Sequence, residues 1–167
     1  MSAAPKTKER CIRIIGIGND YRSDDAAGLL VARTIRDLHL PDVDVLEVSA
    51  GADGLLEAMH GAETAILIDA VSSGSVPGTT FCVDARNEDI RREIFCTSTH
   101  AVGIRETVQL SKVLGLLPQQ CWIYGIEGKD FHQGTALSKN VKRAIDVLAE
   151  EIAQKVESMI HCPVAGL

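Results

Sequence analysis

The feature that most constrains the fold is the run from Thr64 to Val71, Thr-Ala-Ile-Leu-Ile-Asp-Ala-Val, which is apolar almost throughout. A strand with one face in water alternates apolar and polar residues, whereas a near-continuous apolar run indicates a strand buried on both faces. Such a strand lies inside a mainly parallel sheet that is covered by helices on each side. The run therefore predicts an α/β protein with this strand in its interior.

Strand-like and helix-like segments alternate along the rest of the chain. We expect strands at residues 11–17, 43–48, 79–83 and 121–126, and helices at 24–38, 53–59, 102–116 and 138–160. This alternation predicts a mostly parallel sheet with helices on both faces. The strand at 79–83 is expected to be the antiparallel member, because only a short turn precedes it and a parallel neighbour needs a longer crossover. Ser138 is expected to cap the last helix.

The bulk properties restrict the class of protein. The 167 residues fit one domain, 1–167, whose polar first ten residues are expected to be a disordered lead-in. A net charge of −6 without a Lys/Arg cluster argues against nucleic-acid binding. No apolar run is long enough to span a membrane, and residues 1–10 do not resemble a signal peptide. Five scattered cysteines without a C-x-x-C pair argue against a disulfide scaffold. We expect a cytoplasmic monomer.

Polar residues gather where the predicted strands end. Asn19, Asp24 and Asp25 follow the first strand, and Asp69 lies late in the most apolar one. The carboxyl ends of parallel strands meet at one edge of the sheet, where ligands bind. A further loop, just before the helix at 102–116, carries His100. Two carboxylates and one imidazole suit zinc or nickel better than calcium.

Each of these residues also has a purely structural interpretation. Asp24 is most simply explained as the cap of the helix that follows it, whereas for Asp25 the role of an ordinary acid in the first turn of that helix is the alternative. Asp69 is costly to bury unless it is paired or hydrogen-bonded, and it could accept hydrogen bonds from nearby backbone amides. His100 could be an ordinary hydrogen-bonded histidine.

Other chemistries have weaker support. Gly16-x-Gly18 follows a strand and Glu47 ends the next, as in a dinucleotide site, but Tyr21 stands where the third glycine is required. The two acids that follow would also repel a pyrophosphate. Cys96 lies four residues before His100, without an obvious third group to orient the pair. No G-x-S-x-G elbow is present.

Several short motifs occur in the order found in hydrogenase maturation proteases. They are Gly16-Ile-Gly18-Asn19, Asp24-Asp25, Asp69-Ala70, Ser98-Thr99-His100, Tyr124-Gly125-Ile126-Glu127 and Ala136-Leu137-Ser138. The chain resembles this family over residues 11–155. The resemblance implies a three-layer α/β/α sandwich around a mixed, mainly parallel five-stranded sheet. It also implies an endopeptidase that removes the C-terminal extension of a nickel–iron hydrogenase large-subunit precursor after nickel insertion.

The family's metal-contacting and catalytic positions correspond here to Asp25, Asp69 and His100, with nickel presented by the precursor. Asn19 and Ser98 are candidates for contacting the substrate or orienting the ligands. The sequence departs from the family where D-G-G-T is usual, because it has Ser49-Ala50-Gly51-Ala52, and where Gln is common, because it has Glu127. The same ligands would also serve a non-cleaving, nickel-sensing chaperone, and a small-molecule hydrolase with its own metal is a second alternative.

Overall fold

The computed structural model describes residues 11–49, 52–95 and 103–161, and it has one five-stranded sheet. The strands are β1 (Ile12–Ile17), β2 (Val43–Val48), β3 (Thr64–Val71), β4 (Thr80–Asp84) and β5 (Gln120–Glu127). Their order across the sheet is β2-β1-β3-β5-β4. Strands β2, β1, β3 and β5 are mutually parallel, and β4 runs antiparallel to β5. The prediction that the strand near residue 80 is the antiparallel member is confirmed.

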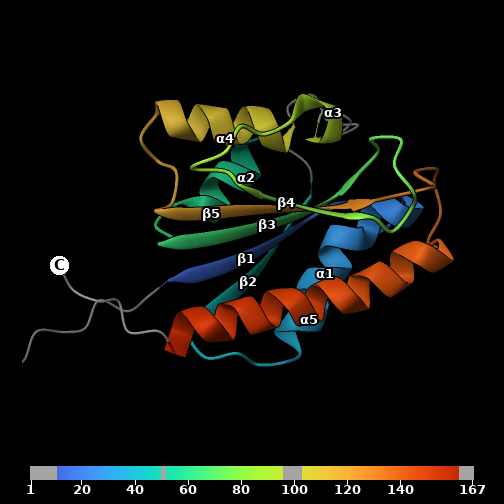
Figure 1. The fold of residues 1–167 in the computed structure, drawn as a ribbon, viewed down its shortest axis with the longest axis horizontal. Coiled ribbons are helices and arrows are strands. Elements are labelled where there is room, and N and C mark those ends of the chain that lie inside the picture. The colour runs from blue at the N-terminus through green and yellow to red at the C-terminus, as the bar shows by residue number, and fades with distance from the viewer. Residues whose placement is uncertain (1–10, 50–51, 96–102, 162–167) are drawn as a thin grey trace, which may run out of the picture.

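Helices cover both faces of this sheet. They are η1 (Ser23–Ala26, a 3-10 helix), α1 (Ala27–Arg36), α2 (Ala52–Met59), α3 (Arg92–Phe95), α4 (Ile104–Val113) and α5 (Lys139–His161). Figure 1 shows α1 and α5 on one face of the sheet, and α2, α3 and α4 on the other. The three-layer α/β/α architecture is therefore confirmed. Within the described parts of the chain, no helix combines the length and apolar character needed to cross a membrane.

Strand β3 contributes to two hydrophobic cores, one on each face of the sheet. All eight residues of β3 are buried, as the apolar run predicts. Alternation along the strand sends Ile66 and Ile68 into the core beneath α1 and α5, and Leu67 into the core beneath α2 and α4. Asp69 shares the parity of Leu67, so it belongs to the α2/α4 side of the sheet.

Two helical predictions need correction. The helix expected from residue 24 begins as the 3-10 turn η1, and the α-helix itself starts only at Ala27. Ser23, the first residue of this turn, has a φ of +50°, which is outside the α-helical region. The four-residue helix α3 was not expected, because it is too short to show a hydrophobic period.

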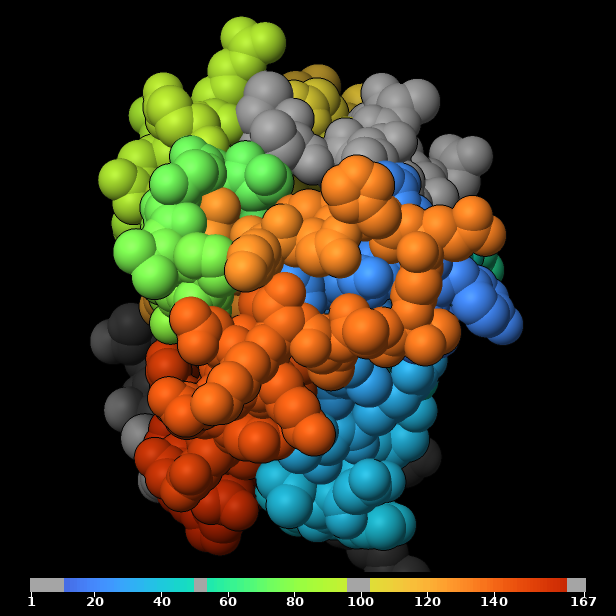
Figure 2. Space-filling view, turned by 90° about the vertical axis from the view of Figure 1, so that its right-hand side faces the viewer, coloured from blue at the N-terminus to red at the C-terminus, as the bar shows by residue number. Residues whose placement is uncertain are grey.

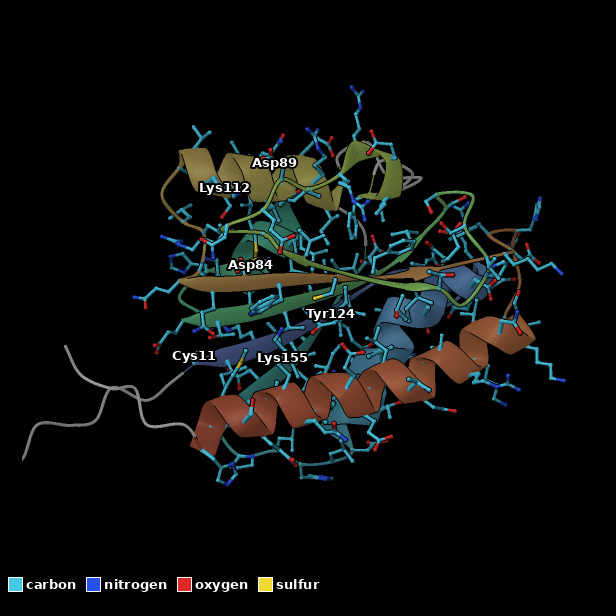
Figure 3. All side chains as sticks on the ribbon, viewed as in Figure 1. Cys11, Asp84, Asp89, Lys112, Tyr124 and Lys155 are labelled. Carbon is cyan, nitrogen blue, oxygen red and sulfur yellow. The ribbon has the colours of Figure 1, made fainter. Side chains whose placement is uncertain are left out.

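The long helix α5 is fastened to the sheet by a cation–π contact. The Lys155 ammonium lies 3.2 Å from the centroid of the Trp122 ring and 5.7 Å from that of Tyr124. Figure 3 shows Lys155 and Tyr124 in the layer between α5 and the sheet. Burial in this layer lowers the pKa of Lys155 from its usual value. The contact helps to fix α5 relative to β5.

Candidate active site

Glycines bring the start of α1 directly onto the ends of β1 and β3. A Cβ on Gly28 would lie 2.3 Å from the carbonyl oxygens of both Ile17 and Ile68, so only glycine fits there. A Cβ on Gly18, whose φ is +153°, would lie 2.0 Å from the Asp25 carbonyl oxygen. The η1 turn is therefore pressed against the carboxyl edge of the sheet, and Asp25 with it.

Asp25 and Asp69 are brought together at this edge. Their residues are only 5% and 6% exposed. Burial, reinforced by the negative charge of Asp25, raises the pKa of Asp69 to about 8 against the opposing effect of a hydrogen bond from the Ala70 amide. Two buried carboxyl groups, one of which raises the pKa of the other, form a site that a cation or a shared proton would stabilise.

Asp24 does not cap its own helix, so that interpretation is wrong. No side-chain cap bond is present at the start of η1 or α1. The fully buried Asp24 carboxylate instead accepts hydrogen bonds from the amides of Lys129, Asp130 and Ser138 and from the Ser138 hydroxyl. Burial acts to raise the pKa of Asp24, but these hydrogen bonds outweigh it and the pKa is lowered.

The other predicted site residues differ in what the structure says of them. The Asn19 side-chain oxygen accepts a hydrogen bond from the Tyr21 amide at 2.8 Å, which closes the turn after β1. Its substrate-contacting role stays a prediction. His100 and Ser98, together with Cys96, lie outside the described residues, so their roles also stay predictions. Within 11–49, 52–95 and 103–161, no three His, Cys, Asp or Glu side chains are grouped closely enough to hold a metal ion.

Glu127 has a structural task that the sequence did not reveal. It is 2% exposed and accepts hydrogen bonds from the Ser73 amide, the Ser73 hydroxyl at 2.7 Å and the Gly74 amide at 3.0 Å. The acid at this position therefore holds the turn between β3 and β4 in place. The only signal in the sequence was an acid at the end of an apolar strand, which burial makes costly unless it is hydrogen-bonded.

The residues that suggested a dinucleotide site are used for packing. Glu47 is paired with Arg33 at 2.6 Å and with Arg36 at 2.7 Å, so α1 neutralises the acid that would contact a ribose. A Cβ on Gly16 would lie 2.5 Å from the Gly28 carbonyl oxygen. The glycine therefore allows α1 to approach β1 closely, which accounts for it without a nucleotide.

Comparisons with known proteins point to one family. The family model of the hydrogenase maturation protease, HycI, matches residues 29–155. The chain is 26% identical over 161 residues to the hydrogenase expression/formation protein HupD of Rhodobacter capsulatus, covering 92% of this chain and 75% of that one. It is 27% identical over 158 residues to a putative hydrogenase maturation protease of Methanocaldococcus jannaschii, covering 90% and 99%.

Solved structures show the same fold. The [NiFe] hydrogenase maturation protease HycI from Thermococcus kodakarensis superposes with a TM-score of 0.68 at 25% identity, covering 89% of this chain and 93% of the other. The hydrogenase maturating endopeptidase HybD from E. coli superposes with a TM-score of 0.72 at 19% identity, covering 89% and 93%, which supports the fold alone.

A sheet with this strand order, an acid pair at its carboxyl edge and a family match over most of the chain together define the class: the chain belongs to the hydrogenase maturation protease family. Members of this family are endopeptidases, which hydrolyse peptide bonds. Family membership thus favours the protease over the non-cleaving chaperone and the small-molecule hydrolase.

Proposed function

We propose that this endopeptidase removes the C-terminal extension of a nickel–iron hydrogenase large-subunit precursor after nickel has been inserted. The observation that carries the proposal is the pair Asp25 and Asp69, buried together at the carboxyl edge of the sheet. Burial and mutual repulsion make this pair unfavourable alone and favourable beside a cation. The nickel of a loaded precursor is such a cation.

His100 is proposed as the third group that contacts this nickel. The segment that carries it follows Phe95, and the Phe95 ring would lie 3.2 Å from a Cβ placed on Gly125. Gly125 is the register partner of Asp69. Five residues of chain span up to about 17 Å, so the segment is long enough for the proposed contact between His100 and the nickel. Two carboxylates and an imidazole are a suitable ligand set for nickel.

The acid pair and His100 would hold the precursor through its metal and so bring the scissile peptide to the edge of the sheet. Nickel there would supply Lewis-acid chemistry, which would polarise a carbonyl or activate a water molecule. Asn19, in the turn that carries Asp25, and Ser98 would contact the substrate or orient the ligands. The proposal includes a monomer that meets its precursor in the cytoplasm, the compartment that scattered cysteines without a C-x-x-C pair favour.

The test is processing of nickel-loaded precursor by purified protein, followed by mass spectrometry of the precursor. We expect wild type to shorten it and His100→Ala to leave it intact while keeping a native circular dichroism spectrum. His161→Ala is the matched control, because His161 is exposed at the far end of α5. Normal processing by His100→Ala would remove the histidine from the mechanism.

The same assay separates the remaining alternatives. A nickel-sensing chaperone would bind the loaded precursor and leave it at full length. A hydrolase that uses its own metal would retain that metal in stoichiometric amount after purification, and metal analysis detects it.

A further inference from the structure

The loop at 128–138 crosses the edge of the sheet at which Asp25 lies. It leaves the carboxyl end of β5 and leads into α5, and it has no regular secondary structure of its own. In Figure 2 this loop, in orange, runs across the middle of the face and in front of the blue residues that follow β1. A loop without internal strands or helices keeps one conformation only if other parts of the molecule hold it.

Both ends of the loop are held by the Asp24 carboxylate. Asp24 Oδ2 accepts hydrogen bonds from the amides of Lys129 at 2.8 Å and Asp130 at 2.9 Å, and from the Ser138 hydroxyl at 2.7 Å. Asp24 Oδ1 accepts one from the Ser138 amide at 2.7 Å. The Asp24 amide also donates to the Asp130 carbonyl at 2.9 Å. One side chain therefore fixes the positions at which the loop begins and ends.

The middle of the loop is joined to the same turn. The Ser23 amide donates to the Gly134 carbonyl at 2.8 Å, and the Gly134 amide donates to the Tyr21 carbonyl at 2.9 Å. The Arg22 guanidinium donates to the Phe131 carbonyl through two nitrogens, at 3.1 and 3.2 Å. These contacts keep the loop beside the turn that carries Asp25, but its ends depend on Asp24.

Asp25 is held by different contacts. Its amide donates to the Arg22 carbonyl at 3.1 Å, and its carbonyl accepts from the Asn19 amide at 3.2 Å. Both bonds lie within the turn after β1, and the close approach of Gly18 adds to them. Loss of the Asp24 carboxylate would thus loosen the two ends of the loop, while its middle stays joined to Arg22 and Ser23 and the backbone of Asp25 stays in place.

We propose that Asp24 is a positioning residue, which fixes the loop at 128–138 as a preformed wall beside the acid pair against which the precursor docks. The proposal rests on the proposed function and names the surface that the precursor meets. Exposed on this wall are Lys129, His132, Gln133 and Thr135, with Tyr21 beside them. A wall that is ordered in advance spares the complex the entropy of ordering the loop, so Asp24 acts on substrate binding.

The experiment is steady-state kinetics of Asp24→Asn on nickel-loaded precursor. The asparagine side chain replaces one acceptor oxygen of Asp24 with an N–H group, which cannot accept hydrogen bonds from the loop. It therefore cannot satisfy the donors at both ends of the loop. We expect KM to rise about tenfold and kcat to change by less than about twofold. Ser138→Ala removes the hydroxyl donor alone, so KM should rise by a smaller factor. If circular dichroism shows that Asp24→Asn does not fold, Ser138→Ala serves as the test in its place.

Glu127→Gln is the matched control, because Glu127 is a second buried carboxylate that holds a loop through hydrogen bonds to backbone amides. We expect it to lose stability without a rise in KM. Unchanged KM in both Asp24→Asn and Ser138→Ala would overturn the proposal, as would an equal rise in KM in Glu127→Gln. If wild type does not cut the precursor, the proposed function itself fails, which is a different result from cutting with unaltered KM.

Discussion

Neighbouring residues of the same type have different tasks at the start of the first helix. Asp24 is surrounded by hydrogen-bond donors that favour its charged form, and its pKa is lowered. Asp25 lies beside Asp69, whose pKa is raised partly by the charge of Asp25. The protein thus stabilises the charged form of Asp24. Asp25 and Asp69, in contrast, leave an unfavourable electrostatic interaction that a cation would relieve.

Asp24→Asn should lower the free energy of unfolding by about 2–4 kcal/mol, because it leaves buried donors without an acceptor. The measurement is urea unfolding near neutral pH. Asp20→Asn is the control, since Asp20 pairs with Arg33 at 2.7 Å but its side chain is 44% exposed. Its loss should be below about 1 kcal/mol. Equal, small losses in the two variants would contradict the structural task given to Asp24.

Asp69 should make the protein less stable as the pH rises. Its pKa is about 8 in the folded protein, against about 3.9 in an unfolded chain. Between these values the folded state holds a proton that the unfolded state has lost, so the free energy of unfolding falls with rising pH until the contribution is gone above the folded pKa. Asp69→Asn should remove this slope. The comparison is unfolding of both proteins at about pH 5 and about pH 8.5, and parallel profiles would exclude the shift.

At the scale of elements, the site depends on how closely α1 approaches the sheet. Gly28→Ala should destabilise the protein by about 1–3 kcal/mol, although alanine is the better helix former. The added Cβ would lie 2.3 Å from two backbone carbonyls, which cannot yield as a side chain does. Displacement of α1 would also separate Asp25 from Asp69, so processing should fall. Thermal unfolding and the precursor assay measure the two effects.

Gly54→Ala provides the contrast for this prediction. Gly54 is also in a helix, but its added Cβ would meet only a methyl group of Val48, at 3.2 Å. That group belongs to a side chain and can shift, so the helix-propensity gain is retained in large part. If both variants lost the same stability, close backbone approach would not be the reason for glycine at position 28.

The elements that sequence patterns predicted are those whose evidence is local. The apolar run at 64–71 and the turn that follows it determine an interior strand and an antiparallel neighbour, and both are present. The task of Asp24 was missed because its partners lie 105 to 114 positions further along the chain. Seen only with its sequence neighbours, an acid at the start of a helix resembles a cap. Glu127 was missed for the same reason, since it holds Ser73 across 54 positions.

At the scale of the molecule, one edge of the sheet collects segments that are far apart in the sequence. The turn after β1, the end of β3 and the loop at 128–138 meet there. The buried acids Asp24 and Glu127 hold the adjoining loops. Parallel topology explains why Asp25 and Asp69 could be expected together from the sequence. The wall formed by the loop at 128–138 could not be expected from the sequence, because the conformation of this loop depends on contacts with distant residues rather than on a local sequence pattern.

This arrangement leads to a prediction about the metal. The proposed ligands come from separate segments and include no thiolate, so the free protein should hold nickel weakly. A folded precursor that already holds nickel would supply the remaining ligands, so the complex would become tight only after loading. A metal-free precursor should therefore resist cleavage even with the protease in excess. Gel electrophoresis of loaded and metal-free precursor, incubated side by side, measures this dependence.

Two controls assign the metal requirement to the substrate. A chelator added after loading should have little effect, because the nickel would be buried in the precursor, and prior removal of metal from the protease alone should have none. Asp25→Asn should abolish cleavage of loaded precursor, because it removes one of the two charges that favour the cation. Efficient cleavage of metal-free precursor would contradict the prediction. So would activity that is lost on stripping the protease and restored by zinc, since that result defines a protease with a metal of its own.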